Sequence, residues 1–298
     1  MKHKMRLHYA GSVLAFAFAC LLTGCETMDP TAAGNFSTGV SAAKAQVNAA
    51  FTASAQVTRE GEIGYVATQP ALKESDFIQT PTADTIATWD QTLSSLEEYA
   101  QDLAALAAPG AAKTFDGAAT NLAESFNQTK TTLLQHSLGS AGLNAGLSAA
   151  FTEVANVILQ AKAQATARKI AAQTDPKMAT IFTLLAEEIG ETRTNGLRGT
   201  LHATWEAELA TLYAPFLTAS NDVAKRTQIA QQFADTLNKR DAQDQSLSSL
   251  RSSILALQNA HHALAEGDAV TLQAAINLVI TEAQRTSGLY NQFKGQLK

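Results

Sequence analysis

Apolar residues recur at alternating spacings of three and four along most of this chain, and this pattern most constrains its fold. Such spacing places the apolar side chains on one face of an α-helix, which must be buried against other helices. Alanine makes up about a fifth of the 298 residues and aromatic residues only 6%, which favours helix over strand. We call such a row of residues along one helix face a seam. One of the two clearest seams consists of Ile86, Trp89, Leu93, Leu96, Ala100, Leu103 and Ala107. The other consists of Leu272, Ile276, Val279, Ala283, Thr286, Tyr290, Phe293 and Leu297.

Stop and start signals divide the chain into about seven helices. Proline is expected at the first helical position after Thr80 and after Asp175, while Gly267 is expected to end a helix. Several helices exceed roughly 25 residues, which corresponds to rods of roughly 40 to 65 Å. We therefore predict an all-α fold, an elongated antiparallel bundle with coiled-coil-like packing. The predicted helices cover residues 37–60, 81–108, 115–133, 144–174, 176–216, 222–266 and 268–297. Gly190, Gly196 and Gly199 are positions at which the segment 176–216 can bend or split, and Pro215 kinks or ends it.

Two stretches depart from the helical pattern, and each has a structural and a functional interpretation. Residues 59–80 contain glycine and proline and predict a long connection, either a plain crossover or a functional loop. Residues 131–152 carry no formal charge and contain three glycines. They predict either a corner where helices pack closely, or a soft tip that contacts a membrane, a glycan strand or a partner. The residues assigned to that tip are Leu138, Leu143 and Leu147.

The first 25 residues have the parts of a bacterial export signal. Basic residues at positions 2, 4 and 6 are followed by an uncharged apolar segment, residues 13–22, which is too short to span a bilayer. The sequence Leu22-Thr23-Gly24-Cys25 then resembles the lipobox of bacterial lipoproteins, and the resemblance covers residues 1–25 only. It implies that a diacylglycerol is attached to Cys25 through a thioether. It also implies that the peptide is cut before Cys25 and that the new amino terminus is acylated.

The lipobox resemblance carries further expectations about location. Two or three acyl chains give stable anchoring, because each buried methylene contributes roughly 0.8 kcal/mol. Glu26 rather than Asp follows the cysteine, which under the sorting rule of such lipoproteins favours the outer membrane, facing the periplasm. The alternative is an ordinary secretory signal followed by a chance cysteine. We predict a signal peptide at 1–24, a lipidated tether at 25–36 and a helical bundle domain at 37–298.

Cysteine content and charge agree with an exported, lipid-anchored chain. Cys20 would be removed with the signal peptide, so the mature chain has no internal disulfide and depends on core burial for stability. Loss of residues 1–24 removes three cations and no anion, which changes the net charge from -5 to -8. An acidic balance argues against a nucleic-acid partner and against adhesion to anionic lipid headgroups. Membrane contact is therefore expected through the lipid on Cys25.

Residues suited to metal binding or catalysis are few. His202 and Glu206 lie four residues apart, as do His262 and Glu266, so either pair can place two metal ligands on one helical face. A solvated polar face is the simpler interpretation of both pairs. His261 falls on an apolar seam, which favours a hydrogen-bonded core histidine over a catalytic one.

The remaining candidates also have simpler structural interpretations. A cluster of glutamates indicates a solvated face, and aromatic residues at seam spacing indicate core rather than a ligand cleft. These residues are Glu187, Glu188, Glu191, Trp89, Trp205, Tyr213 and Phe216. The sequence lacks a nucleophile elbow, a P-loop and a dinucleotide-binding glycine pattern. We predict no enzyme, no cofactor, and no catalytic or metal-binding residue.

The function that these features favour is a non-catalytic scaffold or interaction protein of the cell envelope, bound to an envelope protein partner. The alternative is a helical module that binds a small ligand or blocks a toxin or an enzyme, as a sensor or inhibitor. A membrane-active protein that uses residues 131–152 is a third interpretation, and an enzyme is the fourth.

Overall fold

The computed structural model describes residues 28–67, 69–77, 79–108, 115–136, 138, 141–161 and 166–296. Within these ranges the structure is all-α, as predicted, and consists of eight α-helices and one short 3-10 helix, with no strand. The elements are α2 (Pro30–Val66), η1 (Glu74–Asp76), α3 (Ala83–Ala107), α4 (Phe115–Gln135), α5 (Ala141–Ala161), α6 (Ala167–Ile189), α7 (Gly196–Thr218), α8 (Val223–Glu266) and α9 (Ala269–Gln296).

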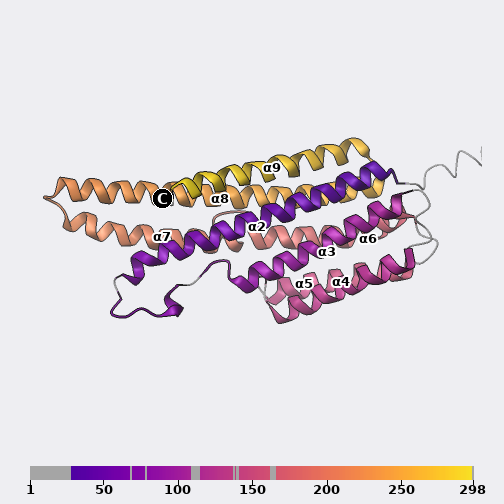
Figure 1. The fold of residues 1–298 in the computed structure, drawn as a ribbon, viewed down its shortest axis with the longest axis horizontal. Helices are drawn as coiled ribbons and strands as arrows, with labels where there is room; N and C mark the ends of the chain where they lie inside the picture. The colour runs from indigo at the N-terminus through magenta and orange to yellow at the C-terminus, as the bar shows by residue number, and fades with distance from the viewer. Residues whose placement is uncertain are drawn as a thin grey trace, which may run out of the picture.

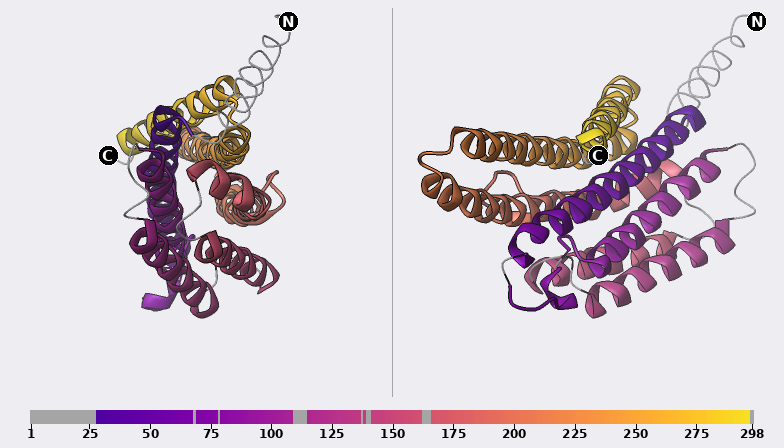
Figure 2. Two further views of the ribbon diagram at one scale, coloured as in Figure 1. Left: turned by 90° about the vertical axis from the view of Figure 1, so that its right-hand side faces the viewer. Right: turned by 60° about the vertical axis from the view of Figure 1, so that its left-hand side comes forward.

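The helices lie side by side along the long axis of the molecule (Figure 1). The longest helix, α8, packs against α2, α6, α7 and α9. Helices α6 and α7 follow one another toward one end of the molecule, and α8 returns beside both of them (Figure 1). Helix α3 packs on α2, while α4 and α5 form a hairpin beside α3 and α6 (Figure 2).

One extended core joins all eight of the described helices, and aromatic rings form much of it. The ring of Phe51 meets Trp89 edge-on at 5.2 Å between centroids, and Phe126 lies 5.3 Å from Phe151. The predicted seam of α3 is confirmed, because its central members are buried. The largest fully buried side chains include Trp89, Tyr99, Phe36, Phe51, Phe126, Phe151, Phe182, Leu93 and Leu96.

The first helix begins earlier than the sequence pattern indicated. Asp29 caps α2 by accepting a hydrogen bond from Thr31 N at 2.9 Å, and Pro30 occupies the first helical position. Phe36 is fully buried in the core. The sequence pattern predicts a tether as far as residue 36, but residues 30–36 are the first two turns of α2. The weak apolar periodicity of this segment hid the helix, because only a few small or aromatic residues face the core.

The helix boundaries between residues 144 and 216 differ most from the prediction, and they explain why the structure has eight helices rather than seven. Asp175 and Pro176 lie inside α6 instead of beginning a helix. Helix α6 is capped by Thr166, which accepts from Lys169 N. The segment after Pro176 is split by a turn in which Gly190 and Gly196 have φ values of 98° and 60°. Glycine tolerates such values because it lacks a Cβ atom.

The predicted connection at 59–80 is shorter than expected, because α2 continues to Val66. Its end is tied back to α2: the Thr58 hydroxyl donates to Thr80 O at 3.2 Å and accepts from Thr80 N at 3.1 Å. The cap of α3 is Thr82, two residues later than predicted. The stop at Gly267, with a left-handed φ of 75°, is confirmed.

Candidate functional site

The residues assigned to a contact tip are inside the bundle. Leu138 and Leu147 are 2% and 0% exposed, and Leu143 is partly buried against the same core. Leu138 N also donates to Asn144 Oδ1, which fixes the turn before α5. The apolar stretch is therefore a packed helix corner, and these three leucines do not offer a contact surface. Cys25 lies outside the described residues.

The two histidine–glutamate pairs take part in ion pairs and hydrogen bonds rather than in a metal site. His202 Nε2 lies 3.7 Å from Glu206 Oε1, but the same oxygen accepts a hydrogen bond from Arg240 Nη1 at 2.7 Å. His262 is directed at Asp175 rather than at Glu266. Among the residues that the structure describes, no three His, Cys, Asp or Glu side chains lie close enough to hold a metal ion.

The aromatic residues considered for a ligand cleft do not come together. Trp89 is in the core, whereas Trp205 donates its Nε1–H to Gln243 Oε1 at 2.6 Å in a small separate cluster. Tyr213 is 60% exposed, and Phe216 lies under the guanidinium of Arg226.

The predicted glutamate face is only partly solvated. Glu187 and Glu191 are exposed, but Glu188 is half-buried, and burial raises its pKa to about 7.

A hydrogen-bonded cluster that the sequence did not predict joins α3, α6 and α8. Asp175 accepts hydrogen bonds from two adjacent histidines: from His261 Nδ1 at Oδ1 and from His262 Nδ1 at Oδ2, both at 2.8 Å. On its other side His261 Nε2 lies 2.8 Å from the Tyr99 hydroxyl, which is 2.7 Å from Thr174 Oγ1. We call these five residues the histidine cluster.

The carboxylate determines which ring nitrogens carry hydrogen. Ionised Asp175 can only accept, so both Nδ1 atoms must donate to it. In a neutral His261 ring, Nε2 is then an acceptor and the Tyr99 O–H donates to it. The Thr174 hydroxyl has a single hydrogen, which it donates either to the Tyr99 oxygen at 2.7 Å or to Ile170 O at 2.8 Å. Every polar atom along this path has a partner, as buried polar groups require.

Burial separates the roles of the two histidines. The side chain of His261 is 1% exposed, and burial lowers its pKa despite the hydrogen bond to Asp175. The side chain of His262 is 65% exposed, and its hydrogen bond to Asp175 raises its pKa. Burial alone would raise the pKa of Asp175, but the hydrogen bonds from both histidines hold it below its usual range.

Tyr99 and its surroundings are closed to a substrate. Its side chain is fully buried, and burial raises the pKa of its hydroxyl far above the usual range. The adjacent cavity measures only about 10 Å³ and is lined mostly by apolar residues, with one acid, Asp102. Burial and the nearby Glu98 raise the pKa of Asp102 to about 6. Tyr99 and the His261 ring are thus buried away from any substrate, as is typical of a structural hydrogen-bonded cluster.

A second polar network clamps the turn between α6 and α7 to α8. Asp244 accepts hydrogen bonds from Arg193 Nε and Arg198 Nε, both at 2.9 Å. Arg198 Nη1 also donates to Glu191 O at 2.6 Å, at the end of α6. In the sequence, residues 238–246 are a mostly polar stretch without a motif that would indicate this clamp.

Beyond this clamp, α7 and α8 continue together as a projection. We call residues 207–238, the outer parts of both helices with their turn, the arm; it forms the left end of the molecule in Figure 1 and projects at the left of the right-hand view in Figure 2. Its interior is narrow, since Ala219 and Ile229 are among its few buried apolar residues. Tyr213, Leu217 and Val223 are 60%, 56% and 77% exposed. The arm therefore presents apolar side chains to solvent.

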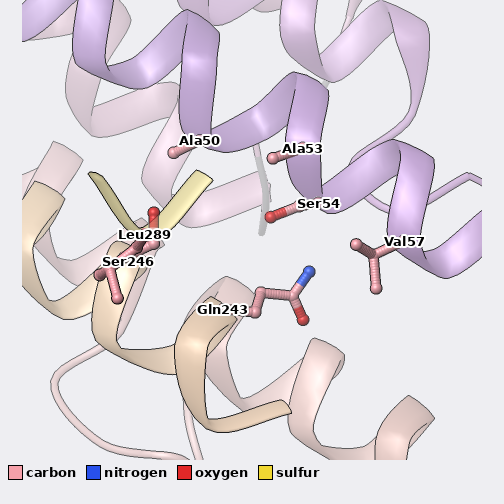
Figure 3. A pocket seen from close by; sticks show the side chains of 7 residues that line it. All are labelled: Ala50, Ala53, Ser54, Val57, Gln243, Ser246 and Leu289. Atoms are coloured by element: carbon pink, nitrogen blue, oxygen red, sulfur yellow. The ribbon is translucent and has the colours of Figure 1, made fainter. Parts of the chain in front are cut away.

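A small cavity lies where α2, α8 and α9 meet (Figure 3). It measures about 10 Å³, enough for a water molecule and too little for a metabolite. Gln243 borders it, and its Nε2 has no hydrogen-bond partner within the described structure. Ser54, on α2, lines the cavity across from Gln243 (Figure 3).

Within the described residues, each helix falls short of the length or the apolar character needed to cross a bilayer. The structure thus offers two features with functional potential: a buried histidine cluster at one end of the bundle and an exposed apolar arm at the other. Comparison of the chain with family models, curated proteins and solved structures finds no match.

Proposed function

We propose that this chain is a lipid-anchored envelope lipoprotein, facing the periplasm, that acts as a scaffold by presenting its arm to another envelope protein. The outer membrane is the proposed location, from Glu26 after the lipobox cysteine. The proposal also includes an elongated, antiparallel bundle with coiled-coil-like packing as the body that separates the anchor from the arm.

The observation that carries the proposal is the position of the arm relative to the start of α2. Helix α2 begins beside the turn between α8 and α9, where Asn35 Nδ2 donates to Gln273 Oε1 at 3.1 Å. The arm lies at the opposite end of α8 (Figure 1). Cys25 precedes Pro30 by five residues, a stretch that can span at most about 18 Å. A lipid on Cys25 would therefore hold one end of the bundle near a membrane and point the arm away from it.

The size of the cavities favours a protein partner over a small ligand. The two cavities described above each measure about 10 Å³, far below the size of a typical ligand pocket. Exposed apolar patches, in contrast, mark protein interaction sites, and tyrosine is enriched in such interfaces. Tyr213, Leu217 and Val223 supply them on the arm.

The anchor is tested by replacing its thiol. The Cys25→Ser variant should lose acyl labelling in cells given a labelled fatty acid, and the protein should leave the membrane fraction. Label retained on the variant would contradict the lipid assignment without bearing on the arm.

The arm is tested by photo-crosslinking in intact cells. A photoreactive residue at Val223 should give one discrete crosslinked protein, whereas the same residue at exposed Gln128 on α4 should not. The double variant Tyr213→Asp, Leu217→Asp should remove the Val223 product without lowering the protein level. Identical products from Val223 and Gln128, or a product that survives the double variant, would contradict the scaffold proposal.

A further inference from the structure

The histidine cluster places one carboxylate between two imidazoles in very different surroundings. Asp175 on α6 binds His261 and His262 on α8 through its two oxygens, both at 2.8 Å. A single carboxylate balances the charge of a single imidazolium. The cluster is therefore neutral only when one of the two histidines is protonated.

Solvent exposure decides which histidine takes the proton. His262 is 65% exposed, so water stabilises its charge, whereas His261 is 1% exposed and its charge would be desolvated. A proton on His261 Nε2 would also face the Tyr99 hydroxyl, whose hydrogen would have to turn to Thr174. The protonation state of lowest free energy therefore has a charged His262, a neutral His261 and an ionised Asp175.

Few other charged groups act on this cluster. Helix α8 adds Glu266, which acts on His262. Helix α3 contributes the neutral hydroxyl of Tyr99 and, across the small cavity beside that ring, the carboxyl of Asp102. From α2 the ring of Phe36 meets His261 edge-on at 5.6 Å, and from α4 the ring of Phe126 lies beside Tyr99. The charge state of the cluster is thus determined mainly by Asp175 and the two histidines.

We propose that Asp175 is the centre of a pH-sensitive latch between α6 and α8. The latch consists of the hydrogen bonds that Asp175 accepts from His261 and His262, and it stabilises the packing of the two helices most when His262 is protonated and His261 is neutral. The latch lies beside the first turns of α2, at the end of the bundle where the lipid anchor is proposed. It does not depend on the arm or its partner, because it involves only contacts within this chain.

The two histidines weaken the latch on opposite sides of pH 6.5, the ordinary pKa of histidine. Contact with Asp175 raises the pKa of His262, so its contribution is complete below 6.5 and is lost as pH rises through its folded-state pKa. Burial lowers the pKa of His261. As pH falls below 6.5, the unfolded chain therefore binds a proton that the folded chain resists, and stability is lost. The latch should be strongest near pH 6.5.

Hydrogen exchange on the full lipidated chain in detergent micelles tests this inference. After correction for intrinsic rates, the opening of the backbone amides of 170–180 and 257–265 should be least frequent at pH 6.5. At pH 5 and at pH 8 these amides should open about three times as often, or more. His262→Gln should remove the increase at pH 8 and keep that at pH 5. His261→Gln should remove the increase at pH 5 and keep that at pH 8. A profile that is the same in all three proteins would overturn the latch.

A second measurement avoids dependence on the buried variant. Ring signals of His261 and His262 in the unmodified sequence can be followed by NMR as pH changes. His262 should titrate above 6.5 and His261 below it. Titration in the opposite order, or of both rings together at 6.5, would overturn the proposal even if His261→Gln does not fold.

Discussion

Asp175 and His261 are 86 positions apart in sequence, yet Asp175 Oδ1 and His261 Nδ1 lie 2.8 Å apart. The contact exists because α6 and α8 run beside each other and because Asp175 lies in the interior of α6 rather than at its start. Its side chain is therefore free to bind another helix instead of capping its own. Pro176, which follows it, is accommodated within α6.

The position of Pro176 has a consequence for stability. Proline lacks the N–H that would bond to residue 172, which costs a helix interior about 3 kcal/mol relative to alanine. Pro176→Ala should raise the free energy of unfolding by roughly 1–3 kcal/mol in a denaturant titration. Pro30→Ala, at the first position of α2, should change it by less than about 0.5 kcal/mol. Equal effects of the two replacements would contradict the assigned helix boundaries.

The turn between α6 and α7 should be intolerant of a side chain. At Gly196 φ is 60°, and a Cβ atom would lie 2.5 Å from Glu188 O. Gly196→Ala should lower the unfolding free energy by roughly 1–3 kcal/mol. At Gly34, where no heavy atom lies within 4 Å of the Cβ position, alanine should raise it by about 0.5–1 kcal/mol. Thermal unfolding of both variants provides the comparison, and a stable Gly196→Ala protein would refute the turn geometry.

The clamp at Asp244 should depend on pH. Burial alone would raise its pKa, but hydrogen bonds from Arg198 and Arg193 hold it below the ordinary 3.8. Its contribution is thus present above pH 3.8 and lost as pH falls through the lower folded-state value. Asp244→Asn should lower the free energy of unfolding by roughly 1.5–3 kcal/mol at pH 6, and by less as the solution is acidified.

The matched control for that clamp is Asp241→Asn. The Asp241 carboxylate pairs with Arg193 and Arg240 but is 46% exposed. Solvent screening should limit its effect to below about 0.5 kcal/mol. An Asp244→Asn cost that is independent of pH would show that charge is not the source of the stabilisation.

Glu188 should show the opposite dependence on pH. Burial raises its pKa from 4.5 to about 7, so the folded chain keeps a proton that the unfolded chain releases. This carboxyl therefore costs stability as pH rises from 4.5 to 7. Glu188→Gln should stabilise the protein by roughly 1–2 kcal/mol at pH 8 and have little effect at pH 4. The exposed neighbour Glu187→Gln should change neither value, and a gain at pH 4 would rule out this explanation.

Local sequence patterns predicted much of the fold and little of the site. The seam through Trp89 and Leu96 and the stop at Gly267 were correct because they depend on neighbours within one helix. The start at Asp175 was wrong, because a cap-plus-proline pair can also sit inside a helix when tertiary packing compensates. The leucines of residues 138–147 were apolar and uncharged in sequence, a pattern that does not distinguish an exposed tip from a packed corner.

The sequence by itself determined that this chain is helical and where several helices begin and end, since periodicity and capping are short-range properties. Only the tertiary structure decided that Asp175 meets His261 and His262, that Leu138 is buried and that Tyr213 is exposed. Those outcomes depend on which helices lie beside each other and how far each extends past its neighbours. They are long-range properties, because a side chain is buried or bonded only by residues that the fold brings to it.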